Sequence, residues 1–564
     1  MNIFNKKNND KEANKFTAGK GKRIIPKIET GEKTNPFGDK RNLHPLDEVE
    51  TNTNIEGSLI DEILQSKEAP AVVSIDNLGE ISSEKELEII SKELIPAGYN
   101  IPKICTNYVR DQFATPEACT IIGRTKHWST NYAKFGYFQH DRALHTHLIG
   151  ESGGGKSTLL LNMFAQDMYM GRGGMILDPH GDVAEDLLDR VPPWRIKDVV
   201  YLDFTDKSNF IGLNALQTFN GTAQQKQDAA EAFIGLMKKQ FGSSWGPNLE
   251  NILRHSLLSL ADVPGMTPLE IRPLLANNIF NRAVRSQIKD KAIAEWWVDK
   301  FDKMSGSMVS QQTSSIENKI SQLISNQTLR NILGQSQTSV NFTELMDNNK
   351  IVIVNLSKGH TSELVSNFVG TILVSKVLGA ALSRQGRVPE PDRVRFALMI
   401  DEFQNFCNED FATILSEARK YGLSLTVAHQ NMGQLSELPL LKNSIENNVQ
   451  NRIIYGIGPT DGKYMEKFMS PLSGADLVNL PNFNIAVKIR VNRQKARAFT
   501  AVTLPKIEPF PEHKKIADLV YQNSLRKYTK PRIDCENEYN ERQDYGREML
   551  NNMNDDDESS AVLL

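Results

Sequence analysis

Continuous apolar, β-branched runs recur along the chain and predict the strands of a parallel sheet. Strands that are buried on both faces read in this way, whereas strands with one solvated face alternate apolar and polar residues. Helical stretches separate most of the runs, so we predict an α/β fold with a doubly wound, mainly parallel sheet. The predicted strands are "GGMILD" (173–178), "DVVYLDF" (198–204), "KIVIVNL" (350–356), "VRFALMID" (394–401), "LSLTVAH" (423–429), "RIIYGIG" (452–458) and "NIAVKIRV" (484–491).

One interval interrupts this alternation of strands and helices. Between residues 219 and 345 the sequence has no convincing strand, while segments such as "QQKQDAAEAFIGLMKKQF" and "NLENILRHSLLSLAD" have apolar positions at helical spacing. We interpret this interval as an all-α subdomain inserted into the α/β core. Two short β-like runs, "ACTIIGR" and "KFGYFQ", precede the core between residues 100 and 145.

The ends of the chain differ from the core in composition. Residues 1–57 are polar and rich in Asn, Lys and Gly, which is typical of a disordered leader or of a flexible basic arm. Residues 533–564 hold 10 acidic residues against 2 Arg, which is typical of a disordered tail or of a tail that binds a partner. The predicted organisation is a polar leader (1–57), a short helical segment (58–100) with one helix at 80–96, the N-terminal section of the core (101–218), the inserted all-α subdomain (219–345), the C-terminal section of the core (346–505) and a C-terminal extension with the acidic tail (506–564).

The composition is that of a soluble globular protein, with 39% apolar and 24% charged residues in 564. A net charge of −3 does not indicate a nucleic-acid binder, although a ring-shaped motor can keep its basic residues inside a channel. The four cysteines are scattered, which predicts reduced thiols. No signal-peptide core is apparent, and the longest apolar stretch, residues 368–382, contains Lys376 and is shorter than the ~20 residues of a membrane span. We expect a cytoplasmic protein, with a buried helix at 368–382.

The segment "HTHLIGESGGGKSTLLLNMF" (145–164) fits G-x-x-x-x-G-K-[ST], with an apolar strand before the loop and a helix after it. Backbone N–H groups of such a loop converge on phosphate oxygens at a helix N-terminus. Lys156 is expected to bridge the β- and γ-phosphates, and the Ser157 hydroxyl to bind Mg²⁺. We therefore predict ATP and Mg²⁺ as cofactors. The predicted nucleotide-binding residues are Gly150, Glu151, Ser152, Gly153, Gly154, Gly155, Lys156, Ser157 and Thr158.

Two further strand ends carry candidate catalytic residues. "ALMIDEF" is an apolar strand that ends in two carboxylates, where Asp401 is predicted to hold Mg²⁺ through water and Glu402 is the candidate general base. The alternative is that this pair only caps the next helix. Gln430 follows the strand "LTVAH", and its amide is predicted to sense the γ-phosphate or to orient water; the alternative is a hydrogen bond within its own loop.

The segment "DPHGD" (178–182) contains Asp178, His180 and Asp182, which are residue types of a metal centre. The Gly and Pro among them favour a tight turn beside the nucleotide.

Three arginines are candidates for a catalytic group supplied by a neighbouring subunit. A guanidinium that reaches the nucleotide of another subunit can stabilise the charge of phosphoryl transfer. The candidates are Arg419 in "SEARKYG", Arg452 in "NVQNRIIY" and Arg254 in "ENILRHS". Each could equally form a salt bridge at the surface of its own chain.

The ordered set of motifs between residues 120 and 503 resembles the HerA–FtsK superfamily of DNA-pumping ATPases, and within it the TraG- and TraD-type conjugative coupling proteins. The motifs that carry this resemblance are "HLIGESGGGKSTLL", "MILDPHGDVAEDLL", "WGPNLENILRHSLLSL", "IVIVNLSKG", "LMIDEFQNF", "FATILSEARKYGLSLTVAHQ" and "NNVQNRIIYGIG".

The resemblance implies a RecA-like core and a hexameric ring that threads DNA through its channel without reading its sequence. It implies catalytic roles for Lys156, Ser157, Asp401, Glu402 and Gln430, and it implies that the helical insertion meets a relaxase–DNA complex. Coupling proteins usually carry N-terminal membrane helices, and none is apparent here. We therefore expect a relative that is soluble or is recruited to the membrane by a partner.

Three functions are compatible with the motifs. The first is an ATP-driven DNA translocase in conjugative or mobile-element transfer. The second is a HerA-like motor that works with a partner nuclease in DNA end processing or phage defence. The third is a nucleotide-switched assembly platform that is not a motor, for which ATP turnover would be slow and indifferent to DNA.

Overall fold

The computed structural model describes residues 84–95, 119–125, 134–218, 221–242, 245–407, 411–491 and 493–545. The predicted leader (1–57) and the end of the acidic tail (546–564) lie outside the described residues. Helix α3 (Glu84–Glu93) lies within the stretch predicted to be helical at 80–96.

Among the described residues, one sheet of 11 strands runs through the molecule in the order β2-β1-β14-β11-β10-β3-β9-β8-β4-β7-β5. The seven strands from β10 to β5 are parallel, and the four strands beyond β10 pair antiparallel. The strands are β1 (Cys119–Thr125), β2 (Lys134–Phe138), β3 (Thr146–Ile149), β4 (Gly173–Asp178), β5 (Val199–Asp203), β7 (Ile351–Asn355), β8 (Phe396–Ile400), β9 (Leu423–His429), β10 (Asn451–Ile454), β11 (Asn484–Lys488) and β14 (Phe499–Thr503). The predicted α/β fold with a doubly wound, mainly parallel sheet is confirmed.

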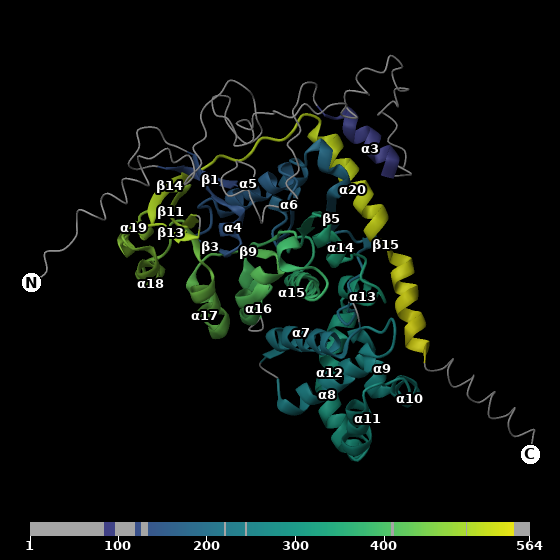
Figure 1. Cartoon of the computed structure of the whole chain (residues 1–564). Helices are drawn as coiled ribbons and strands as arrows, with labels where there is room; N and C mark the ends of the chain where they lie inside the picture. Colours follow the sequence, from purple (N-terminus) through teal and green to yellow (C-terminus); the bar gives the residue numbers. More distant parts are fainter. Residues whose placement is uncertain are drawn as a thin grey trace, which may run out of the picture.

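The sheet is covered on both faces by helices, which explains the continuous apolar runs of its strands. In β4, Met175 and Leu177 belong to one apolar cluster, whereas Ile176 between them belongs to a second cluster on the opposite face. The second cluster contains residues of α5 (Lys156–Tyr169), α6 (Asp182–Leu188) and α20 (His513–Tyr528). The first contains residues of α15 (Glu363–Leu382), α16 (Phe411–Glu417) and α17 (Pro439–Asn448). The sheet therefore lies between two helical layers (Figure 1).

Helix α15 is the buried helix that was predicted at 368–382, and it is longer than that apolar stretch. By length and composition it could cross a membrane, but 72% of its most apolar window is buried inside the fold. Lys376 is accommodated because its Nζ donates to the backbone oxygen of Gln217. These contacts are those of a core helix.

Between β6 (Asn209–Phe210) and β7, the described residues form helices and no strand. Figure 1 shows the helices between residues 223 and 325 grouped below one end of the sheet, with the C-terminal chain running down beside them. The helices between β6 and β7 are α7 (Ala223–Phe241), α8 (Pro247–Ala261), α9 (Ile271–Ala276), α10 (Asn278–Arg285), α11 (Lys291–Trp296), α12 (Gly306–Ser325), α13 (Gln327–Leu333) and α14 (Phe342–Asp347).

Some elements differ from the predicted pattern. The run predicted as one strand at 484–491 is β11 followed by β12 (Arg490–Val491), which turns into a separate hairpin with β13 (Gln494–Lys495). Arg493 adopts a positive φ of 65° in this turn. Strand β14 was not predicted. Further helices are α4 (Gln139–Arg142), α18 (Pro459–Met469) and α19 (Gly474–Val478), and residues 532–545 are also helical.

Candidate nucleotide-binding site

The phosphate loop connects β3 to α5, as the motif predicts. Gly155 has a φ of 112° and directly precedes Lys156, the first residue of α5. A Cβ at Gly150 would lie 2.4 Å from the Cβ of Tyr455, so no larger residue fits there without a shift. Glycine is therefore needed at Gly155 for its backbone conformation and at Gly150 for space.

Two aromatic residues that the sequence did not indicate hold this loop in place. The Tyr455 hydroxyl donates to the Gly155 carbonyl oxygen at 3.0 Å, and Tyr455 is fully buried. The Phe483 backbone N–H donates to the Gly154 carbonyl oxygen at 3.0 Å, and Phe483 has a φ of 62°, which is rare for a bulky side chain. Tyr455 lies in the motif "NNVQNRIIYGIG" and Phe483 in none, but the contact of each with the loop is evident only from the tertiary structure.

Lys156 lies folded over its own loop. Its Nζ donates to the carbonyl oxygens of Gly150 at 2.6 Å and Glu151 at 3.0 Å. Burial lowers the pKa of Lys156, while the carboxylates of Asp401 and Glu402 act in the opposite direction. The amine is therefore placed within the loop, close to two acidic groups that attract it.

Ser157 and Asp401, far apart in the sequence, are neighbours in the fold. The Ser157 hydroxyl donates to Asp401 Oδ2 at 3.3 Å. Burial, together with the charges of Asp178 and Glu402, raises the pKa of Asp401 to about 6. A bound divalent cation would relieve this crowding of negative charge, and a hydroxyl with a carboxylate supplies the oxygen ligands that Mg²⁺ prefers. The two residues predicted to hold Mg²⁺ therefore fit that role.

Two glutamine amides hold the carboxylate of Glu402, which is buried. Gln430 Nε2 donates to Glu402 Oε1 at 2.8 Å, and Gln404 Nε2 donates to Glu402 Oε2 at 2.7 Å. Glu402 itself adopts a left-handed backbone with a φ of 46°, and its N–H donates to Asp401 Oδ1 at 3.0 Å. Strained backbone of this kind persists where the surroundings impose it, as they often do at functional sites. The sequence predicted Gln430 and missed Gln404.

Strand order explains why these residues meet. The carboxyl ends of parallel strands lie at one edge of a sheet. The phosphate loop follows β3, Gln430 follows β9 and Asp401 follows β8, and β9 lies between β3 and β8. One intervening strand between the loop strand and the carboxylate strand is the order of the RecA-like class.

One known family matches part of the chain. Residues 395–478 match the family model described as the TraM recognition site of TraD and TraG. This segment is TraG/TraD-like. It runs from β8 to α19 and includes Asp401, Glu402 and Gln430. The resemblance to TraG- and TraD-type proteins stated from the motifs is thus confirmed.

Several solved structures resemble the chain at low identity. The bacterial conjugative coupling protein TrwBdeltaN70 is 16% identical, with a TM-score of 0.47, over 67% of this chain and 87% of that chain. TrwB in complex with ADP and Mg²⁺ is 16% identical, with a TM-score of 0.48, over 70% and 94%. VirB4 of Thermoanaerobacter pseudethanolicus is 15% identical, with a TM-score of 0.47, over 70% and 98%. No curated protein sequence matches the chain significantly.

The three candidate arginines do not gather at the phosphate loop. Arg254 lies on α8 and pairs with Glu231 at 2.6 Å and Glu250 at 3.0 Å. Arg452 is buried on β10, where Nη2 donates to the Glu446 carbonyl oxygen at 2.6 Å. Arg419 is exposed on the 3₁₀ turn η9 (Ala418–Tyr421) that precedes β9. A role in a neighbouring subunit stays a prediction for each.

The segment 178–182 forms a turn at the start of α6. Asp178 accepts hydrogen bonds from the backbone N–H groups of His180, Val183 and Ala184 at 2.9, 2.8 and 3.0 Å. No cluster of three or more His, Cys, Asp or Glu side chains able to hold a metal occurs in the described portion of the chain. Asp178 therefore caps a helix, and its charge also acts on Asp401.

Proposed function

We propose that the chain is an ATPase that moves DNA, and that it acts in conjugative or mobile-element transfer. The observation that carries the proposal is the meeting of Ser157 with Asp401 at 3.3 Å, beside a Glu402 carboxylate that Gln430 holds at 2.8 Å. A phosphate loop, a metal-binding pair and a fixed carboxylate are the groups that hydrolysis of a nucleoside triphosphate requires.

Each side chain has a defined task in this proposal. The loop N–H groups bind the phosphates, and Lys156 turns from the carbonyls of Gly150 and Glu151 toward the γ-phosphate. Ser157 and Asp401 would hold Mg²⁺, which would offset the charge of the phosphates. Glu402 accepts the proton of the attacking water, and Gln430 links the orientation of Glu402 to the end of β9.

The assembly and its partners follow from the family likeness. We propose a homo-hexameric ring that contacts the DNA backbone without sequence preference. We further propose that a DNA-processing partner, such as a relaxase complex, binds the inserted all-α subdomain at 219–345, and that the protein works in the cytoplasm and is recruited to a membrane by a partner. The family segment at 395–478 supports a partner contact, since the model is described as a recognition site in TraD and TraG.

Steady-state hydrolysis of ATP, with and without single- and double-stranded DNA, tests the proposal. The parent protein should hydrolyse ATP faster with one of the two forms. Lys156→Ala should abolish turnover through lost nucleotide binding, whereas Glu402→Gln should bind ATP normally and lose at least about 100-fold in kcat. A rate of ATP hydrolysis that neither DNA form changes would contradict the proposal of a DNA motor and favour the nucleotide-switched assembly platform.

A further inference from the structure

Lys239, near the end of α7, binds the turn that follows the catalytic carboxylate. Its Nζ donates to the backbone oxygens of Gln404 at 2.7 Å, Asn405 at 2.8 Å and Cys407 at 3.0 Å. A lysine ammonium has three N–H donors, and all three are used here. A single side chain from the helical segment therefore binds three backbone oxygens of this turn.

The turn in question connects directly to Glu402. It contains the 3₁₀ turn η8 (Phe403–Asn405), in which the Asn405 N–H donates to the Glu402 carbonyl oxygen at 3.0 Å. The side chain of Gln404 then reaches back to Glu402 Oε2 at 2.7 Å. Only Gln404 stands between the amine of Lys239 and the carboxylate of Glu402.

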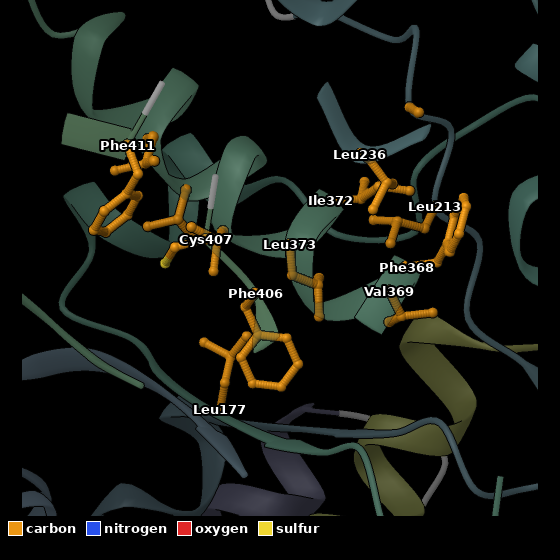
Figure 2. Packing of buried hydrophobic residues seen from close by; sticks show 14 of the residues in the cluster. Leu177, Leu213, Leu236, Phe368, Val369, Ile372, Leu373, Phe406, Cys407 and Phe411 are labelled. Carbon is orange, nitrogen blue, oxygen red and sulfur yellow. The ribbon is translucent and has the colours of Figure 1, made fainter. Parts of the chain in front are cut away.

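Apolar packing joins the same elements. Leu236, one turn before Lys239 on α7, belongs to the cluster that also contains Phe406 and Cys407 (Figure 2). The Phe406 ring occupies the space beside Gly370 of α15, where a Cβ would lie 2.3 Å from Phe406 Cδ1. Helix α7 and the 403–407 turn thus pack against the same apolar cluster. A displacement of α7 would therefore displace the turn.

We propose that Lys239 is a positioning residue that couples the helical segment to Glu402 through the 403–407 turn and Gln404. This inference rests on the proposed ATPase activity. A ligand that shifts α7 changes the orientation of Glu402 and so changes the rate of hydrolysis. Lys156 and Ser157 are not in this series of contacts, and the proposed change is in the orientation of the Glu402 side chain, so we expect nucleotide binding to be unaffected.

Lys239→Met tests the proposal, because it removes the three donors and keeps the apolar stem. A displaced catalytic group can cost up to about 100-fold, and we expect kcat to fall between about 10- and 100-fold. The KM for ATP and the affinity for a non-hydrolysable ATP analogue should stay within about 2-fold, since binding energy is not changed. Lys238→Met is the matched control: Lys238 is 61% exposed and its nearest charged partner, Glu250, is 3.9 Å away. It should keep the parental kcat.

A double-mutant cycle with Gln404→Ala separates the coupling between Lys239 and Gln404 from a nonspecific loss of activity caused by either substitution. If Lys239 acts through Gln404, the double variant should be no slower than the slower single variant. Parental kcat in Lys239→Met, or losses that multiply in the double variant, would overturn the inference. If Lys239→Met folds poorly, Lys239→Arg can replace it in the same double-mutant cycle with Gln404→Ala. A parent protein that does not hydrolyse ATP would instead contradict the proposed function. That result is obtained before any variant is made, so the two failures can be distinguished.

Discussion

Two histidines join the strand that leads into the phosphate loop to the strand that leads into Gln430. His147 on β3 and His429 on β9 are buried, and their Nε2 atoms lie 2.6 Å apart. His429 Nδ1 lies 2.9 Å from the Asn431 carbonyl oxygen, which can only accept, so Nδ1 carries the proton. In the neutral ring Nε2 then accepts from His147 Nε2–H. This fixes both tautomers and ties the loop strand to the Gln430 strand.

The pair should make stability depend on pH. Burial lowers the pKa of His429 to about 4, and Glu402, Lys156 and Arg452 are the charged groups that act on the two rings. Below pH ~6.5, His429 binds a proton in the unfolded chain but stays neutral in the folded chain. The free energy of unfolding therefore falls as pH drops from ~6.5 toward 4. His429→Gln should destabilise the fold at pH 7.5, and this deficit should shrink by up to about 2 kcal/mol at pH 4.5. Urea denaturation at pH 7.5 and pH 4.5 measures the loss of unfolding free energy, with a substitution of an exposed histidine, His360→Gln, as control. A loss that is the same at both pH values would contradict the prediction.

The pattern of neighbouring residues in the sequence identifies some residues of the site but not others. Lys156 and Ser157 sit in one run of consecutive residues, and Asp401 follows a continuous apolar strand, so their positions can be read along the chain. Gln404 and Tyr455 lie within "LMIDEFQNF" and "NNVQNRIIYGIG", but nothing in the local pattern sets them apart from their neighbours as site residues. Their contacts with the site depend on a strained turn and on the pairing of β10 beside β3, which are tertiary features.

At the scale of elements, the C-terminal chain bridges the sheet and the helical segment. After α20, β15 (Lys530–Pro531) pairs with β6, and residues 532–545 are helical. Arg542 in this helix pairs at 3.3 Å with Glu270, whose carboxylate is fully buried and also accepts from Thr267 N–H at 2.7 Å. Burial raises the pKa of Glu270, which means that its charge depends on this partner.

Removal of that partner should be costly. Arg542→Ala leaves the Glu270 carboxylate buried without its guanidinium, and breaking a buried pair in this way costs about 3–5 kcal/mol. The free energy of unfolding from chemical denaturation should fall accordingly. Arg532→Ala, in the same helix, is the control, because Arg532 is exposed and its ion pair with Glu536 is open to solvent, where such pairs contribute little to stability. Equal losses in the two variants would mean that Arg542 does not anchor the helix.

The same scale shows why some elements escaped prediction. The buried strands of the parallel core are recognisable as continuous apolar runs, and every one of the seven predicted runs contains a strand of the large sheet. Strand β14, "FTAVT", has only two buried positions among five, so it lacks that signal. Strands β6 and β15 have two residues each and pair across most of the chain, so no local pattern can indicate them.

At the scale of the whole molecule, the position of Arg419 decides where it can act. It precedes β9, whereas the phosphate loop follows β3, and the two strands are parallel with Ile149 opposite His429. A seven-residue strand spans roughly 20 Å, so Arg419 lies at the opposite edge of the sheet from its own loop. Arg254 and Arg452 are engaged by groups of their own chain. Arg419 is therefore the candidate best placed to serve a neighbour.

Mixing of inactive subunits tests this assignment within the proposed ring. Arg419→Ala subunits keep an intact phosphate loop, and Lys156→Ala subunits keep an intact Arg419, so each preparation alone should hydrolyse almost no ATP. In an equal mixture about one quarter of the interfaces join an intact loop to an intact arginine, so hydrolysis should recover to about one quarter of the parental rate. A mixture that stays inactive, in rings shown to exchange subunits by energy transfer between labelled chains, would exclude Arg419. Arg254→Ala is the comparison: the salt bridges of Arg254 to Glu231 and Glu250 hold it within its own subunit, so this variant should hydrolyse ATP without any partner variant. Recovery in the Arg419 mixture would require catalysis at the contact between subunits, because neither chain carries a complete site by itself.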